Sequence, residues 1–514
     1  MPINMNSLKN SIEDIRLNTK IFTKQSSNDT ETSKIKKDDE EKTQWKSIYI
    51  GGLLAFSSNV QFSIYFATIW PYLQILDPHV SEEFFGLVLG SYSISNIIFS
   101  PVFGWWSNKI KCIKIPLYIG ITSQLIGNFL YFILDKLPCY QKEFMIVSRI
   151  ITGVGWSSVS LLRSYAATAS TEKDRSRAVS IISGGLAFGV TIGPSLNLLF
   201  IGLGYPGISI LKNIYFHIYN MPSFLAVVAN GCSLLAVKYI FVEKYVGIHK
   251  YEASKKEDSS MSLPKYDKVA VTVAFISRFV QMFIVSNLST LGPIISMMMF
   301  NFTKKQTVTV IAYAQGFLGF SAFFVYFLFI FIDIGKYGKF RRNIMFGFGL
   351  LVIFHLIVYP YPFIYNDSPK VSQYDSRTMI NITSSTELTG CDISKFDWCE
   401  NLPIINPYLY FISYSLCVGI AFPVVNSAMN TLFSRILGNR RQGTMQGWLQ
   451  TCGGVGTLTA PIISAFIYQN FGPKIIFIYQ ILLGLIVISL WSIYHHRMVP
   501  LKINNDNEKN IEKS

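Results

Sequence analysis

The chain alternates between long apolar runs and short polar loops. Apolar runs of roughly 20 residues recur about twelve times, and this is the length that a helix needs to cross a bilayer. The predicted spans are 47–70, 84–103, 115–134, 144–166, 178–203, 217–241, 269–295, 308–332, 344–362, 408–433, 444–468 and 474–494. A helix satisfies its own backbone polar groups in lipid, so the pattern predicts an all-α membrane protein.

The positions of the glycines and prolines indicate an internal repeat. Thr68-Ile69-Trp70-Pro71 in the first span corresponds to Thr290-Leu291-Gly292-Pro293 in the seventh. The fifth span ends in Gly189–Pro194, and the eleventh ends in a similar segment, Gly456–Pro461. Two six-helix halves related by an axis along the membrane normal follow from this, with the substrate bound near the midplane between them.

The repeat predicts the organisation of the whole chain. We expect a disordered cytoplasmic tail at 1–46, an N-terminal six-helix bundle at 47–241, a cytoplasmic linker at 242–268, a C-terminal six-helix bundle at 269–496 with a lumenal loop at 364–407, and a second cytoplasmic tail at 497–514.

Composition agrees with a membrane protein and excludes several other classes. Of the 514 residues, 50% are hydrophobic and only 15% are charged, whereas soluble domains carry about 25% charged residues. The net charge of +15 comes from Lys and Arg in short loops between spans, so we expect membrane lipid as the partner and no nucleic acid. The sequence has no P-loop, dinucleotide fingerprint or HExxH motif, so we expect no cofactor, no metal and no enzyme activity.

Basic loops predict the orientation. Lys109, Lys111 and Lys114 follow the second span without an acid, and such loops stay in the cytoplasm. Both termini are then cytoplasmic, and the loop 364–407 is lumenal. This loop holds glycosylation sequons at Asn366 and Asn381, which are modified in that compartment. It also holds Cys391 and Cys399, which are able to pair in an oxidising lumen.

Three segments resemble the major facilitator superfamily. Arg149–Gly155 has an Arg followed by spaced glycines, as in the fourth helix of that family, and Gly189–Pro194 is similar to its fifth-helix pattern. Gly104–Lys109 occupies the place of the loop signature between its second and third helices, but Asn108 stands where the family usually has Asp. The resemblance implies two pseudo-symmetric six-helix bundles and a transport function.

A narrower resemblance is carried by Ala67–Leu73, Tyr92-Ser93 and Arg163-Ser164-Tyr165. Together these segments are similar to a lysosomal branch of the superfamily. That resemblance implies a multi-pass protein of the late endosome or lysosome membrane. Anion (chloride) conductance has been proposed for the branch.

Charged and amide side chains inside the spans are the candidates for a transport path. The candidates are Arg149, Arg278, Trp70, Gln61, Gln281 and Asn426. No Asp or Glu lies well inside a predicted span, so the cavity is net positive and favours an anion. The alternatives are a snorkelling or structural role for the arginines and interhelical hydrogen bonds for the amides.

Two further sets of residues have mechanical roles in this interpretation. The predicted cytoplasmic gate and hinge consist of Arg163, Glu172, Asp174, Arg175, Arg177, Asn108, Lys109, Arg440 and Arg441. The predicted helix-packing residues are Gly153, Gly155, Gly189, Gly193, Pro194, Gly456 and Pro461, since small residues let helices approach closely in lipid.

The sequence therefore predicts a monomeric endolysosomal transporter that moves a small anionic solute by alternating access. An anion channel on the same fold is one alternative. A membrane adaptor without transport is the other. Substrate identity lies beyond these patterns.

Overall fold

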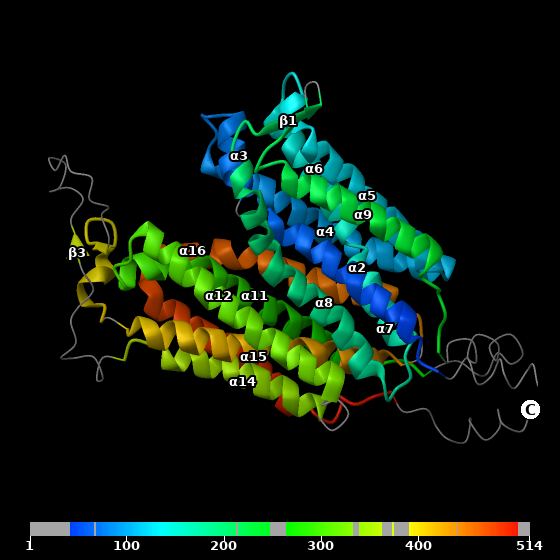
Figure 1. The fold of residues 1–514 in the computed structure, drawn as a ribbon. Helices are drawn as coiled ribbons and strands as arrows, with labels where there is room; N and C mark the ends of the chain where they lie inside the picture. The colour runs from blue at the N-terminus through cyan, green and yellow to red at the C-terminus, as the bar shows by residue number, and fades with distance from the viewer. Residues whose placement is uncertain are drawn as a thin grey trace, which may run out of the picture.

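The computed structural model describes residues 42–65, 68–211, 214–246, 264–332, 339–361, 373–374, 390–403, 405–438 and 440–501. Most of both predicted tails and both predicted glycosylation sites, Asn366 and Asn381, lie outside these residues. Helices dominate the described chain, as the apolar pattern predicted (Figure 1).

The N-terminal half contains eight helical segments and a small hairpin. The helices are α2 Trp45–Ile64, α3 Ile69–Leu76, α4 Glu82–Ile110, α5 Lys114–Phe132, α6 Gln141–Trp156, α7 Val159–Thr168, α8 Arg175–Leu196 and α9 Met221–Tyr239. Short 3-10 turns lie at Leu134–Lys136 and Asn197–Leu203. Strands β1 Ile208–Leu211 and β2 Ile214–Phe216 pair antiparallel before α9; the sequence pattern did not predict them.

Two spans that we predicted as single helices are broken. The first divides into α2 and α3. Pro71 lies in the first turn of α3, where its missing N–H costs little. In the interior of one continuous helix the same proline would remove a backbone hydrogen bond. The fourth divides into α6 and α7 at Ser157 and Ser158. Their hydroxyls donate to the carbonyls of Gly153, at 3.1 Å, and Gly155, at 2.8 Å, and such bonds to the preceding turn bend helices.

The C-terminal half contains α11 Lys268–Met299, α12 Lys304–Phe327, a π-helical turn η3 Leu328–Ile332, α14 Phe340–Ile357, α15 Pro407–Leu437 and α16 Gly443–Ile493. Two short parallel strands, β3 Gln373–Tyr374 and β4 Cys391–Asp392, and a 3-10 turn, η4 Asp397–Asn401, precede α15. The eighth and tenth predicted spans fall on α12 with η3 and on α15.

The long helix α16 is two helices joined at a sharp bend. Gly472 has a φ of 77°, which favours glycine, and Pro473 follows it. The start of α16 contacts Asn108, and Trp491 near its end donates to Ser277 Oγ at 2.8 Å on the first turns of α11. The two parts correspond to the predicted spans 444–468 and 474–494.

Nine helices of the described chain are long and apolar enough to cross a membrane. This number counts α16 once, although it bends back at Gly472, and it omits α2 and α5. The expected number of about twelve is therefore not reached by length and apolarity alone.

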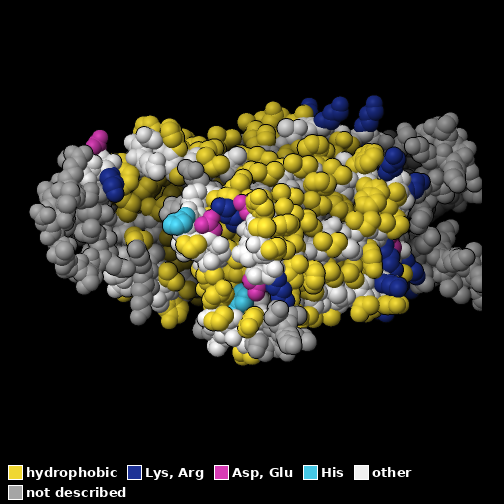
Figure 2. All heavy atoms as spheres, turned by 90° about the horizontal axis from the view of Figure 1, so that it is seen from above, with side chains coloured by type: hydrophobic (Ala, Val, Ile, Leu, Met, Phe, Trp, Pro, Cys, Tyr) yellow, Lys and Arg dark blue, Asp and Glu magenta, His cyan; other side chains and the backbone are white. Residues whose placement is uncertain are grey.

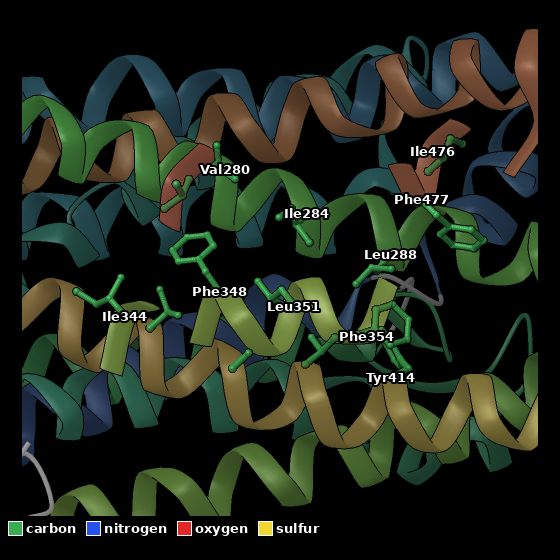
Figure 3. Close-up of a cluster of buried hydrophobic side chains, with 14 of the residues drawn as sticks. Val280, Ile284, Leu288, Ile344, Phe348, Leu351, Phe354, Tyr414, Ile476 and Phe477 are labelled. Atoms are coloured by element: carbon green, nitrogen blue, oxygen red, sulfur yellow. The ribbon is translucent and has the colours of Figure 1, made fainter. Parts of the chain in front are cut away.

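Each half has its own apolar interior. In the C-terminal half, Val280, Ile284 and Leu288 of α11 face Phe348 and Leu351 of α14 (Figure 3). Two further clusters lie within the N-terminal half. The outer surface is also widely hydrophobic, and Lys and Arg gather toward one end of the molecule (Figure 2). This arrangement suits a protein whose flanks contact lipid.

The halves meet along two seams. Helix α16 packs against α4 on one side of the molecule, and α12 and α15 pack against α8 on the other. Figure 1 shows α2 to α9 grouped on one side and α11 to α16 on the other. The sites described below lie inside the N-terminal half and between the two halves.

Candidate functional site

Arg278 lies well inside α11 and is 2% exposed. Its Nη1 donates to Asn426 Oδ1 at 2.8 Å and to Gln281 Oε1 at 3.1 Å. Asn426 Nδ2 in turn donates to the hydroxyl of Tyr326 at 3.0 Å, and Asn430 Nδ2 donates to Asn426 Oδ1 at 2.9 Å. Residues of α11, α12 and α15 therefore hold this guanidinium in place.

A second buried arginine reaches the same place from the other half. Arg163 on α7 is 7% exposed, and its Nη1 donates to Gln450 Oε1 on α16 at 2.5 Å. Arg278 reaches the same helix, since its Nε lies 3.1 Å from the position of a Cβ added to Gly453, one turn beyond Gln450. We call Arg163, Arg278, Tyr326, Asn426 and Gln450 the arginine cluster. It joins the two halves through the bond of Arg163 to Gln450.

The interior carries positive charge without matching acids. Within the described residues, the buried Lys, Arg, Asp and Glu side chains are Arg149, Arg163, Arg175 and Arg278, and none is a carboxylate. Among the described residues, the Nε atoms of Arg163 and Arg278 find no hydrogen-bond partner. Buried charge is costly unless it is paired. The arginine cluster is therefore suited to binding an anion that supplies the missing charge.

Arg149 lies apart from this cluster. Its guanidinium stacks over the ring of Tyr65 at 4.0 Å and over that of Tyr131 at 5.4 Å, which is cation–π geometry. The side chain is 5% exposed. Arg149 and Arg278, both predicted for the transport path, therefore lie at separate sites, and the arginine that shares α16 with Arg278 is Arg163.

Buried amides surround Arg149. Gln61 and Asn230 exchange hydrogen bonds of 3.0 and 2.9 Å, and Asn128 Nδ2 donates to Gln61 Oε1 at 3.0 Å. The hydroxyl of Tyr65 donates to Asn128 Oδ1 at 2.7 Å. We call Gln61, Tyr65, Asn128 and Asn230 the amide network. A small pocket next to it is lined by Gln61, Tyr65, Asn128 and Arg149.

Asn108 joins the halves at the end of α4. Its Nδ2 donates to Thr444 Oγ1 at 2.8 Å, and its Oδ1 accepts from the backbone N–H of Gly443 at 3.1 Å. Gly104 lies so close that an added Cβ would be 2.3 Å from the carbonyl oxygen of Gly443. An amide both donates and accepts here, which an ionised Asp cannot do.

The predicted hinge residues lie at this same end of the molecule. Arg435 Nη2 donates to the backbone carbonyl of Glu172 at 2.6 Å, and Asp174 Oδ2 accepts from the hydroxyl of Thr43 at 2.5 Å. Arg175 is buried. The contact across the halves therefore uses the Glu172 carbonyl and a neighbouring arginine that the sequence did not single out.

The remaining basic residues of the predicted gate lie on aromatic rings or carbonyls. Lys109 lies 4.9 Å from Trp105, Arg177 4.8 Å from Trp45 and Arg441 4.8 Å from Tyr245. Arg440 donates to Pro264 O at 2.7 Å. Lys109 thus contacts its own helix, Arg177 contacts the start of α2, and Arg440 and Arg441 contact residues between α9 and α11.

The predicted packing glycines lie where helices approach each other. A Cβ on Gly153, Gly155, Gly189 or Gly456 would lie 2.4–2.6 Å from a carbonyl oxygen of a neighbouring helix. A Cβ on Gly193 would collide with Ser63 Oγ at 1.9 Å. Pro194 and Pro461 lie inside α8 and α16.

Trp70 and the cysteine pair lie away from both polar clusters. Trp70 packs on Phe85 at a ring distance of 5.1 Å, near the end of the N-terminal half that is remote from Asn108. Cys391 and Cys399 are joined by a disulfide. The described residues contain no group of three or more His, Cys, Asp and Glu that could hold a metal ion.

Sequence reasoning missed several members of the two clusters, among them Tyr326, Gln450, Asn128 and Asn230. A usable signal existed for the amides, because polar side chains inside apolar spans are rare and usually face a partner. Nothing in the sequence distinguishes Tyr326 from the other tyrosines of the chain.

A family model of the Major Facilitator Superfamily matches residues 51–371 and 398–514. The chain belongs to this superfamily. It is 28% identical over 481 residues to "Major facilitator superfamily domain-containing protein 8" of Xenopus laevis, which covers 89% of this chain and 92% of the relative. The major facilitator fold that the sequence predicted is therefore confirmed, and the chain is a multi-pass membrane protein.

Solved structures show the same fold. The human organic anion transporter MFSD10 (TETRAN) superposes with a TM-score of 0.60 at 14% identity, covering 87% of this chain and 99% of the other. The transporter FucP in the outward conformation superposes with a TM-score of 0.61 at 12% identity, covering 87% and 98%. Identities this low establish the fold alone.

Proposed function

We propose that this protein is an endolysosomal transporter that moves a small anionic solute between its two halves. The observation that carries the proposal is the pair Arg163 and Arg278, one from each half, both buried against α16 with no buried carboxylate among the described residues. Uncompensated guanidinium groups in a low-dielectric interior attract an anion strongly. That a fold relative is named an organic anion transporter supports the same substrate class.

The contacts between the halves support transport by alternating access. At one end of the molecule Asn108 bonds to Thr444, Arg435 to the carbonyl of Glu172, and the hydroxyls of Ser180 and Ser427 lie 3.1 Å apart. Positive loops flank this end, so we assign it to the cytoplasm. A transporter closed here admits its solute from the opposite, lumenal side, and reverses by breaking these contacts.

The finer features of the proposal come from the sequence. We assign both termini and the linker at 242–268 to the cytoplasm and the loop at 364–407 to the lumen, glycosylated at Asn381 and Asn366. The residues 47–241 and 269–496 form the two moving bundles of a monomer. The endolysosomal location rests on the resemblance of the first-half segments to a lysosomal branch.

Anion flux into proteoliposomes tests the proposal. A panel of inorganic and organic anions is compared for wild type, Arg163→Gln and Arg278→Gln. Each change removes a buried charge from the site and should lower flux of the transported anion by about tenfold or more, since hydrogen bonds to charged groups are worth about 1.5–3 kcal/mol.

Arg497→Gln is the matched control, because Arg497 is exposed and pairs at 3.7 Å with Asp267 outside the cluster. It should leave flux unchanged. Wild-type flux in both cluster variants would overturn the anion proposal. Ion flux faster than one conformational cycle per ion would favour the channel alternative instead.

A further inference from the structure

An apolar groove runs along the seam between the halves, next to the arginine cluster. It has a volume of about 230 Å³ and is lined mainly by aromatic rings, among them Phe56 and Phe188 on one side and Phe323, Phe327 and Phe331 on the other. We call it the lateral groove. Its outer rim is open on the flank of the molecule, where Phe331 is 66% exposed and Phe323 47% exposed.

Small residues make room for the groove. Gly184 and Gly185 on α8 and Gly319 on α12 contribute no side chain to its walls. An added Cβ on Gly184 would lie 3.4 Å from the ring of Tyr326. At the end of α12 the helix widens into the π-helical turn η3, which supplies Phe331 to the groove. Such turns occur often at functional sites.

Tyr326 belongs to both the groove and the arginine cluster. Its ring lines the groove, while its hydroxyl accepts the hydrogen bond from Asn426, which in turn accepts from Arg278. The lateral groove, which is open toward lipid, thus reaches Tyr326, and Tyr326 is hydrogen-bonded to the buried arginine cluster. A ligand that matches both parts has an apolar chain and an anionic group.

We infer that the transported anion is a single-chain amphiphile, with its anionic group held by Arg163 and Arg278 and its apolar chain lying in the lateral groove. The volume is below the range of about 300–1,000 Å³ for drug-sized ligands, which fits one chain and not the two chains of a phospholipid. Lateral entry past Phe323 and Phe331 keeps the chain out of water. The inference rests on the proposed function, because it specifies the anion bound at the same cluster.

Octyl sulfate and methyl sulfate separate the two parts of the inference. Both carry the same permanent charge, and only the first has a chain. Uptake of each radiolabelled anion into proteoliposomes is measured below the micellar concentration. We expect wild type to prefer octyl sulfate by at least about tenfold, since each buried methylene contributes about 0.8 kcal/mol. Excess octanol should compete weakly, because it lacks the charge.

Gly184→Leu fills the groove and should lower the ratio of octyl sulfate to methyl sulfate uptake toward one. Gly349→Leu is the control, since Gly349 on α14 has no atom within 4 Å of an added Cβ and lies outside the groove. If Gly184→Leu fails to fold, Phe323→Ala replaces it, because Phe323 is exposed on the rim and its loss should also lower the ratio severalfold.

Three results are distinguishable. An unchanged ratio in the groove variants, with both uptakes lowered by Arg278→Gln, would overturn the amphiphile and leave the anion transporter standing. Equal uptake of the two sulfates by wild type would also overturn the amphiphile and leave the anion transporter standing. Uptake insensitive to Arg163→Gln and Arg278→Gln would overturn the proposed function itself.

Discussion

At the scale of single residues, neutral amides link helices inside the N-terminal half by hydrogen bonds. Gln61 on α2 uses its amide oxygen to accept from both Asn128 on α5 and Asn230 on α9. The same side chain donates back to Asn230. Three helices are therefore tied at one side chain, next to the stacked guanidinium of Arg149.

Asn230→Leu removes one member of this amide network. Gln61 Nε2 then keeps only its 3.4 Å contact with Ser57, so we expect a loss of stability of about 1 kcal/mol, typical of interhelical hydrogen bonds in membranes. Thermal unfolding in detergent measures it.

The double variant Asn230→Leu with Gln61→Leu is the control, because replacing both partners with apolar groups is nearly neutral. The double variant should lose less stability than the two single variants lose together. Strict additivity would show that the two amides do not interact.

At the scale of elements, side chains far along the chain determine how helices begin and bend. Glu243, in the segment we predicted as a linker, accepts from the backbone N–H groups of Ile113 at 2.7 Å and Lys114 at 2.9 Å at the start of α5. A carboxylate is favourable at a helix N-terminus. Glu243 thus fastens the end of the N-terminal half to the loop between α4 and α5.

Glu243→Gln should weaken this cap and change the neighbouring thiol. Burial, together with the charge of Glu243, raises the pKa of Cys112. Removing the charge lowers that pKa, so more thiolate is present at pH 8 and alkylation by a maleimide should become faster. The exposed Cys139 serves as internal control, with an unchanged rate. No acceleration at Cys112 would contradict the cap.

Gly472 shows the same dependence on a distant segment. At its φ of 77° a Cβ would also lie 2.7 Å from the ring of Trp398, which donates to Gln469 O at 3.3 Å. Gly472→Ala should therefore destabilise the protein by about 1–3 kcal/mol from backbone strain alone, measured by thermal unfolding. Gly349→Ala, in open space, is the control. Equal stability of the two variants would contradict this account.

At the scale of the whole molecule, transport requires the two halves to separate at the end where Asn108 meets Thr444. Backbones approach here because Gly104 and Gly443 carry no side chain, and Gly447 lies equally close to Ser100. The contact of Asn108 with Thr444 is uncharged, so it separates without breaking an ion pair.

Asn108→Cys with Thr444→Cys places two thiols where the side chains now share a 2.8 Å hydrogen bond. Oxidation should join the halves and stop the flux, and reduction should restore it. Each single variant is its own control and should not respond to oxidation. Full flux by the crosslinked protein would rule out opening at this end and favour a channel.

The sequence by itself determined the membrane class, the family and the positions of most helices. Apolar length and internal backbone bonding are local properties, and they do not depend on which helices are neighbours. It also marked Arg149 and Arg278, because a charge inside an apolar run is visible without a structure.

The breaks in the first and fourth spans and the separation of Arg149 from Arg278 required the tertiary structure. So did the meeting of Arg163 with Arg278 and the lateral groove beside Tyr326. These features arise from contacts between residues far apart in the chain, such as Arg163 with Gln450 and Arg278 with Asn426. Helix rotation and packing set those contacts, and an apolar pattern that is nearly uniform around each helix carries little information about either.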